Sequence, residues 1–184
     1  MERLIERVKA ILLMPEAEWL VIAREPDDTA ALLTRYVAVL ALIPALAGFF
    51  GVSLFGGDRS VLAGLIGAAV SYLLTFAAVF IVAHIVDAVA PTFGVQKNFP
   101  NALKLTVYSY TPAWLAGIFL LLPALSLLTL VGLYGGYLVW LGLPPLMQAP
   151  RGKALPYAGA VVLCAFIIEM LIGAVQFTMF GRAR

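Results

Sequence analysis

Apolar residues occur in long runs that short polar segments separate, and this is the clearest pattern in the chain. A helix that crosses a bilayer needs about 20 predominantly apolar residues. Three runs of that length stand apart from their neighbours, at residues 36–55, 61–86 and 157–180. The first contains Pro44 near its middle, where we expect a kink. Each of the three runs predicts a membrane-spanning helix.

Residues 105–147 form one apolar run of 43 residues. As a single helix the run would be about 65 Å long, about twice the hydrocarbon thickness of a bilayer. It must therefore fold back on itself, and Pro123 is the best place for the turn. The turn divides the run into spans at 105–122 and 124–147. The sequence thus predicts an all-α, polytopic transmembrane bundle of five spans.

The first 35 residues follow a different pattern. Apolar residues recur at helical spacing, at positions 4, 5, 8, 11 and 12, and charged residues fill the other face. This amphipathic helix fits a position in the membrane interface, and it also fits packing on the cytoplasmic end of the bundle. Pro15 opens a second short helix that carries Trp19. We therefore divide the chain into a cytoplasmic or interfacial segment, 1–35, and a transmembrane domain, 36–184.

Positively charged residues favour the cytoplasmic side of a membrane, and here they are unevenly distributed. In the five-span arrangement the side of the N-terminus holds Arg3, Arg7, Lys9, Arg24, Arg35, Lys97, Lys104, Arg151 and Lys153. The opposite side holds only Arg59, Arg182 and Arg184. The distribution predicts a cytoplasmic N-terminus and a C-terminus outside. A four-span arrangement satisfies the count equally well, so the five-span prediction depends on the length of the run 105–147.

The composition supports a membrane protein. Hydrophobic residues make up 63% of the chain and charged residues 12%, whereas a soluble domain is about half apolar and roughly a quarter charged. The formal net charge of +2 is small and scattered, which argues against nucleic acid as a partner. A single cysteine, Cys164, excludes an intramolecular disulfide and a cysteine metal cluster. Lipid is therefore the expected surrounding.

The first long apolar run begins near Tyr36, too late for a cleaved signal peptide, so we expect the first span to remain in the mature protein. Eight arginines against four lysines, with abundant Ala, Gly and Leu, are typical of a GC-rich bacterial source. We expect a multi-pass protein of a bacterial inner membrane.

The residue patterns of common catalytic sites are missing from the sequence. One histidine cannot build a His-rich metal site, and no glycine-rich phosphate loop ends in Lys-Ser or Lys-Thr. There is also no Gly-x-Ser-x-Gly turn for a nucleophilic serine. We therefore expect no enzyme activity, no cofactor and no metal.

Glu169 is the sharpest anomaly because it lies near the centre of the last span. A carboxylate at that depth costs about 2.5–3.5 kcal/mol, so it should face the bundle interior or be protonated. Matching depths along the spans suggests five partners: Ser71, Tyr72 and Thr75 in the second span, and Tyr134 and Tyr137 in the fourth. Glu169 is then either a hydrogen-bonded tie between helices or a proton-linked, substrate-contacting acid.

Two further features are candidates of lower weight. His84 and Asp87 are three residues apart on one helix face and could form a pH-sensitive gate, although hydrated polar residues are ordinary at a helix end. The Gly132-x-x-x-Gly136 spacing allows close contact between helices and supports packing without identifying a dimer.

Several motifs resemble the Yip (Ypt/Rab-interacting protein) membrane family, and its bacterial members in particular. They are Pro15-x-x-x-Trp19, the stretch 98–104, Tyr110-Thr111-Pro112, the stretch 133–138, Gly142-Leu143 and Lys153-Ala154. The resemblance covers most of the chain and implies a five-span membrane protein. Eukaryotic Yip proteins are linked to Rab GTPases, but this chain lacks their Asp-Leu-Tyr-Gly-Pro element. The bacterial relatives as a group have no established biochemical activity.

Two functions fit these observations. The first is a non-enzymatic scaffold or adaptor that binds other membrane proteins, associates with itself, or organises lipid through its amphipathic helix. The second is a small transporter or channel-like protein that uses Glu169. We favour the first because catalytic groups are missing and Glu169 is the only charge deep within a predicted span.

Overall fold

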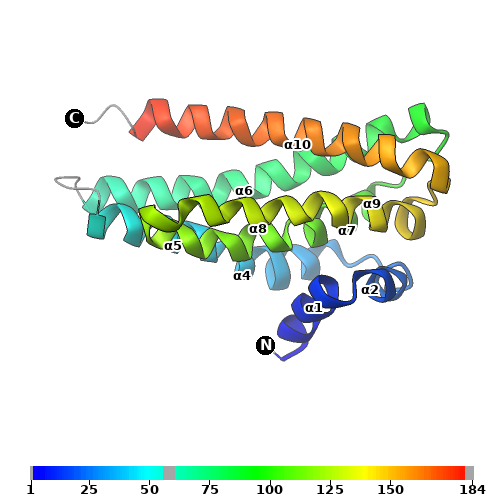
Figure 1. Cartoon of the computed structure of the whole chain (residues 1–184), viewed down its shortest axis with the longest axis horizontal. Coiled ribbons are helices and arrows are strands. Elements are labelled where there is room, and N and C mark those ends of the chain that lie inside the picture. Colours follow the sequence, from blue (N-terminus) through cyan, green and yellow to red (C-terminus); the bar gives the residue numbers. More distant parts are fainter. Residues whose placement is uncertain (1, 56–60, 181–184) are drawn as a thin grey trace.

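The computed structural model of the protein describes residues 2–55 and 61–180, which form helices without a strand (Figure 1). The helices are α1 Glu2–Leu13, α2 Pro15–Ile22, α3 Thr29–Ala31, η1 Leu32–Val37, α4 Ala38–Leu40, α5 Leu42–Phe55, α6 Val61–Val89, η2 Ala90–Phe93, α7 Phe99–Ser109, α8 Thr111–Ala116, η3 Gly117–Leu121, η4 Pro123–Leu133, α9 Tyr134–Met147 and α10 Arg151–Phe180. The all-α prediction is confirmed.

Among the described residues, 4 helical segments are long and apolar enough to cross a membrane: Thr29–Gly51, Val61–Phe93, Ala124–Met147 and Arg151–Thr178. They cover the predicted first, second, fourth and last spans. The predicted third span is divided among α7, α8 and η3, because the helix is interrupted at Tyr110. The five-span arrangement stays a prediction. Arg59, Arg182 and Arg184 of the charge count lie outside the described residues.

The chain reverses direction next to Pro123, where the sequence predicts a turn. Leu122 has an extended backbone, with φ of −120° and ψ of 113°, between the 3-10 helices η3 and η4. These two helices pack against each other, and α8 packs against η4. Proline fits here because it favours an extended residue before it and can begin a helix.

The first span is irregular, as Pro44 predicts. The helix is interrupted at Ala41, between α4 and α5, because Pro44 has no N–H to donate to the carbonyl of the preceding turn. A wider, π-helical turn precedes the interruption at Leu32–Val37. Pro44 also contacts Gly117, since a Cβ on this glycine would lie 2.6 Å from the proline Cβ. The kink therefore lies where α5 approaches η3.

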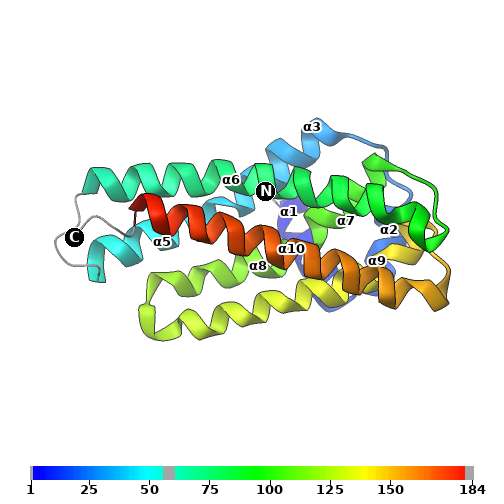
Figure 2. The ribbon, with the colours of Figure 1, turned by 90° about the horizontal axis from the view of Figure 1, so that it is seen from above.

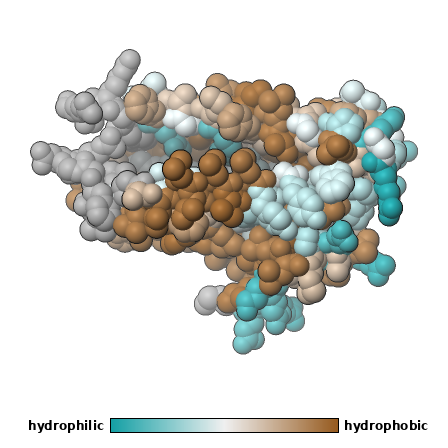
Figure 3. Space-filling view, viewed as in Figure 1, coloured by the Kyte–Doolittle hydropathy of each residue, from teal (hydrophilic) through white to brown (hydrophobic). Residues whose placement is uncertain are grey.

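The two ends of the bundle differ in burial. The capped end, defined as residues 2–25, 78–109 and 138–161, holds most of the buried side chains, including all of 102–109. The apolar end, defined as residues 61–77, 118–133 and 162–178, has no buried residue among those described. In Figures 1 and 2 the long helices α6 and α10 run through both ends, and α10 lies along α6 and α9. Figure 3 shows hydrophobic surface over the middle of the bundle and hydrophilic residues toward the capped end.

Helices α1 and α2 pack on the bundle. Ile11 and Ile22 are fully buried, and Leu4, Val8 and Leu12 pack against the core. Of the two positions that the sequence allows for the amphipathic helix, this agrees with packing on the bundle, and Figure 1 shows α1 and α2 together along one side of it. Whether the helix also touches a lipid interface stays a prediction.

The small-residue spacing at Gly132 and Gly136 serves packing within the chain. A Cβ on Gly132 would lie 3.0 Å from Ala113 Cα, and one on Gly136 would lie 3.3 Å from Val162 Cγ2. These glycines let η4 approach α8 and let α9 approach α10.

Candidate functional site

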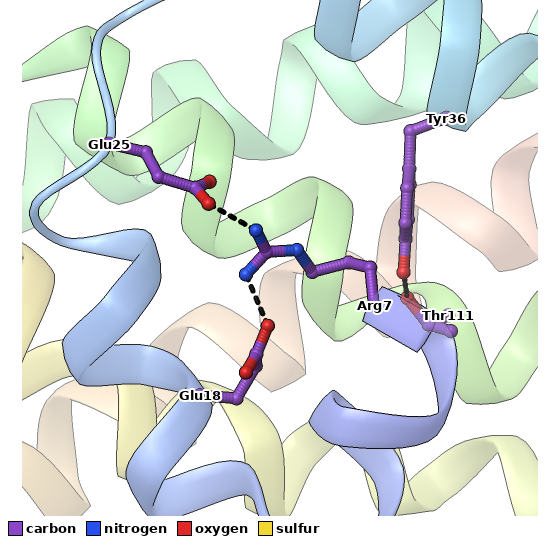
Figure 4. Close-up of polar contacts among 5 residues, drawn as sticks. All are labelled: Arg7, Glu18, Glu25, Tyr36 and Thr111. Atoms are coloured by element: carbon purple, nitrogen blue, oxygen red, sulfur yellow. Dashed lines mark hydrogen bonds and ion pairs between the residues drawn. The ribbon is translucent and has the colours of Figure 1, made fainter. Parts of the chain in front are cut away.

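Arg7 fastens helix α1 to α2 and to the segment after α2. Its guanidinium forms ion pairs with Glu18 and Glu25 (Figure 4) and lies over the ring of Tyr108, 5.8 Å from the ring centroid. Burial by itself lowers the pKa of Arg7, whereas Tyr108, Glu25 and Glu18 raise it, and the net shift of the pKa is upward. Arg7 therefore stays charged and joins α1, α2 and α7 through charge-assisted contacts.

Trp19 of α2 is fully buried between α7 and α9. A Cβ on Gly142 would lie 2.8 Å from Trp19 Cε2 and 2.5 Å from Leu105 Cδ1, so only glycine leaves room for the indole ring. The ring also meets Tyr108 edge to face, with centroids 6.2 Å apart. Trp19 and Gly142 belong to two of the motifs that carry the family resemblance, and the fold brings them into contact.

Lys104 attaches α7 to the segment after α2. This residue is only 7% exposed, and its Nζ donates a hydrogen bond to the carbonyl of Glu25 at 2.7 Å. The same ammonium pairs with Asp27 Oδ1 at 2.6 Å. A buried lysine needs such partners because an unpaired charge is costly away from water.

Asparagines at the start of α7 place it against α9. Asn98 caps α7 by accepting a hydrogen bond from the backbone N–H of Asn101, and Asn101 Nδ2 donates to the carbonyl of Leu146 at 2.8 Å. Farther along, Tyr36 Oη and Thr111 Oγ1 form a buried hydrogen bond of 2.8 Å (Figure 4). Polar pairs thus join α7 to α9 and α8 to η1.

The cap, which we define as residues 2–25, covers one wall of a cavity of about 470 Å³ between α1, the segment 25–32 and α7. We refer to this space as the cap cavity. Its charged lining residues are Arg3, Arg7, Glu25, Asp27, Asp28, Arg35 and Lys104. Arg7 and Lys104 are paired with carboxylates, whereas Arg3 and Arg35 form no ion pair with the described residues. Two cations are therefore available to a ligand or partner.

Glu169 hydrogen-bonds to Tyr110, which donates from its hydroxyl at 3.0 Å. Tyr110 lies at the interruption between α7 and α8, so this bond ties α10 to the third predicted span. Glu169 is exposed in the isolated chain, at the surface of α10. A carboxyl group tied to a neighbouring helix agrees with the expectation that Glu169 joins helices, but with a different partner.

None of the five partners suggested by depth matching forms a hydrogen bond with Glu169 among the described residues. Tyr72 donates to the carbonyl of Ala38, Thr75 donates to the carbonyl of Ser71 in its own helix, and Tyr134 donates to the carbonyl of Leu12. Tyr137 lies beside the rings of Tyr134 and Trp140. The partner prediction for Glu169 is therefore wrong. Helices α6 and α9 do pack against α10, but depth along the spans does not reveal which way each side chain faces.

His84 and Asp87 are not joined by a hydrogen bond or an ion pair. His84 Nδ1 is 2.8 Å from the carbonyl of Phe80, and its ring packs on Phe99. Asp87 has a buried Oδ1 without a hydrogen-bond partner among the described residues. The described residues also contain no group of three His, Cys, Asp or Glu side chains arranged for a metal.

Comparison with known proteins identifies the family of the chain. A family model described as the Yip1 domain matches residues 9–172. The chain belongs to the Yip1 domain family. It is also 25% identical over 179 residues to a protein named Inner membrane protein YohC, from Escherichia coli strain K12 and from Escherichia coli O6:H1. Each match covers 91% of this chain and 92% of the relative. No solved structure matches the chain.

The predicted family resemblance is thereby confirmed, and the chain is a membrane protein of the Yip1 family. Its motif residues make the polar contacts described above: Asn98, Asn101, Lys104, Tyr110 and Thr111. Sequence reasoning placed none of these in a site, and it missed the ion pairs of Arg7. A lysine and a run of polar residues in an otherwise apolar stretch were the available signal, since such groups need partners when buried.

Proposed function

We propose that this Yip1-family protein is a non-enzymatic membrane scaffold or adaptor, and that the cap with its cavity is the surface that receives another membrane protein or lipid headgroups. The observation that carries the proposal is the attachment of the cap. Arg7 holds α1 to two carboxylates, and Trp19 is fully buried in the bundle. A surface fixed in this way is preorganised, which lowers the entropic cost of binding.

The charges around the cap cavity support a polar partner. Arg3 and Arg35 line the cavity without an ion pair among the described residues, while Asp28 uses its carboxylate to cap α3 through the N–H of Ala31. A partner that brings a carboxylate or phosphate to the two arginines would complete the charge pairing. The transporter alternative has no comparable support, because Glu169 is tied to one tyrosine and not to a series of polar groups.

We also infer a five-span topology in a bacterial inner membrane, with α7, α8 and η3 as the third span. Residues 99–121 would extend about 35 Å as a helix, enough for the hydrocarbon core of a bilayer. The chain reversal at Leu122 supports this arrangement. The loops after η2 and after α9 lie at the end of the bundle near α2, which fits a cytoplasmic N-terminus and an outside C-terminus (Figure 1). The relatives are named as inner membrane proteins.

The test is affinity purification from native membranes after brief cross-linking, read by mass spectrometry. The wild type is compared with the double variant Arg3→Gln and Arg35→Gln, which removes the two available cations of the cavity. Arg24→Gln is the matched control, because Arg24 is an exposed arginine of the cap outside the cavity. We expect a stoichiometric partner with the wild type and the control, and about tenfold less with the double variant, equivalent to ~1.4 kcal/mol.

Two results would contradict the proposal. In the first, the protein is recovered without a stoichiometric partner and does not bind vesicles that contain phosphatidylglycerol. In the second, the double variant retains the wild-type partner at full yield. Vesicle flotation distinguishes a lipid partner from a protein partner. If lipid headgroups are the bound species, the chain binds phosphatidylglycerol vesicles in the absence of a second protein.

A further inference from the structure

A second cavity, of about 270 Å³, lies within the helical bundle and away from the cap. It is bordered by α6, α7, η4, α9 and α10, and Glu169 and Ser109 both line it. Gly132, Gly135 and Gly136 also border it, at points where their backbone closely approaches a neighbouring helix. Because Glu169 is exposed as well as lining the cavity, the space opens at the surface of α10.

The lining is apolar apart from a few side chains, and two of these lack full hydrogen bonding. Ser109 is 4% exposed, and its hydroxyl has no hydrogen-bond partner among the described residues. Glu169 receives one hydrogen bond, from Tyr110 to Oε1, and no described residue donates to its other oxygen. The hydroxyls of Thr106 and Thr129 differ, because each donates to a backbone carbonyl of its own helix.

The membrane around α10 gives significance to the unmet hydrogen bonds of Ser109 and Glu169. Arg151–Thr178 is one of the segments long and apolar enough to span a membrane, so the cavity mouth at Glu169 faces hydrocarbon when the helix is inserted. Water is scarce there, and polar groups in a membrane normally pair with one another or with backbone carbonyls. A carboxyl oxygen and a hydroxyl within one cavity therefore call for a partner that enters from the lipid.

We propose that this cavity binds a membrane amphiphile whose polar end donates hydrogen bonds, namely a primary amine or a primary alcohol. The free oxygen of Glu169 accepts the hydrogen bond, and Ser109 exchanges a second one with the same polar group. The apolar chain lies along Val82, Val86 and Val139, which line the rest of the space. A volume of about 270 Å³ accommodates a chain of moderate length and not a whole phospholipid. The site is separate from the cap cavity and does not depend on the scaffold role.

The proposal can be tested with the full chain in discs of phosphatidylcholine, a lipid whose headgroup donates no hydrogen bond. The probe is a decylamine that carries a photoreactive diazirine, and labelled peptides are identified by mass spectrometry. We expect labelling within residues 105–113 and 161–169. An excess of unlabelled decylamine or decanol should suppress it about tenfold, whereas decyltrimethylammonium and decane should not.

Variants separate the roles of the two side chains. Ser109→Ala removes the unpaired hydroxyl with little change in volume, and Glu169→Leu removes the acceptor, so both should lower the labelling severalfold. Glu169→Gln keeps a carbonyl acceptor and should retain competition by decanol while weakening competition by decylamine. Gln176→Leu is the control, since it also removes a polar group from α10 but lies outside the cavity lining.

Three outcomes would overturn the proposal. In the first, the label spreads evenly over the exposed faces of α5, α6 and α10, which would indicate ordinary contact with lipid. Alternatively, decane or decyltrimethylammonium competes as well as decylamine, which shows that hydrogen-bond donation is irrelevant. Finally, labelling that is unchanged in both Ser109→Ala and Glu169→Leu places the amphiphile somewhere else. Because Ser109→Ala is a minor change, the test remains decisive even if a Glu169 variant is poorly folded.

Discussion

The capped end and the apolar end share the long helices α6 and α10, yet different interactions hold them. At the capped end, side chains are buried and joined by polar contacts, such as Arg7 with Glu18 and Lys104 with the carbonyl of Glu25. At the apolar end, large side chains such as Leu127 and Phe177 are 77% and 71% exposed. In a bilayer, lipid tails cover those side chains and supply no net hydrophobic driving force between helices.

The stability of the fold should therefore reside mainly at the capped end. Packing of side chains against the cap and α7 should dominate the free energy of unfolding, because cavities and lost hydrogen bonds are costly only where groups are buried. Substitutions at the apolar end should change lipid contacts more than stability.

Trp19→Ala should be the most destabilising substitution. It removes a fully buried indole from between α7 and α9, and such changes cost about 3–5 kcal/mol. The buried Nε1 of Trp19 has no hydrogen-bond partner among the described residues, so the loss is one of packing. Unfolding in detergent micelles measures the change, and proteolysis of the segment 23–28 shows whether the cap is released.

Phe177→Ala is the matched control at the apolar end, because it removes another aromatic ring at a position that is 71% exposed. We expect a change of about 0.5 kcal/mol or less, typical of surface positions. If the two substitutions destabilise the protein equally, the contrast between the two ends is wrong.

Two glycine substitutions should give the next largest change in stability. Gly142→Ala adds a Cβ that would lie 2.5 Å from Leu105 Cδ1 and 2.8 Å from Trp19 Cε2, so we expect a loss of about 1–3 kcal/mol. Gly173→Ala adds a Cβ with nothing within 4 Å, and it should stabilise α10 by up to about 1 kcal/mol. The difference in apparent melting temperature between the two variants is the measurement. A neutral Gly142→Ala would show that Trp19 is loosely packed.

Lys104→Met should have a smaller effect. The change retains most of the apolar stem and removes the hydrogen bond to the Glu25 carbonyl, so we expect a loss of about 1.5 kcal/mol. Asp27→Asn is the control, because the Asp27 side chain is 53% exposed and an exposed ion pair contributes about 0–1 kcal/mol. Hydrogen exchange in residues 23–28 should rise in Lys104→Met and change little in Asp27→Asn. Equal exchange in both variants would mean that the carbonyl contact is unimportant.

Much of the architecture could be predicted from the sequence, because the length of an apolar run is a direct physical requirement of the bilayer. The helical class and the turn next to Pro123 follow from run length and from the chemistry of proline. The predicted third span differs because its helix is interrupted at Tyr110, so none of α7, α8 and η3 is long enough by itself to cross a bilayer.

The candidate site was less accessible to sequence reasoning. Glu169 was identified because an intramembrane carboxylate is costly, but its partner Tyr110 depends on which helices lie side by side. Likewise, the charged residues of the first helix gave an amphipathic pattern without revealing that Arg7 faces Glu18 and Glu25. Such contacts are set by the packing of distant segments and leave no periodic signal.

The hydrogen bond between Tyr110 and Glu169 should have the smallest effect. Hydrogen bonds between helices within membranes average about 0.6 kcal/mol, because the separated helices also find partners. Tyr110→Phe and Glu169→Gln, alone and combined, form a double-mutant cycle that isolates the pair. We expect a coupling free energy of about 0.6 kcal/mol from unfolding in phosphatidylcholine discs. A coupling near zero would remove Glu169 as a tie between α10 and the third span, leaving its role in the cavity as the reason for a carboxyl group at this depth. A coupling above about 2 kcal/mol would mean that the bond is shielded from competing partners, and the apolar end would then be held more tightly than its exposure indicates.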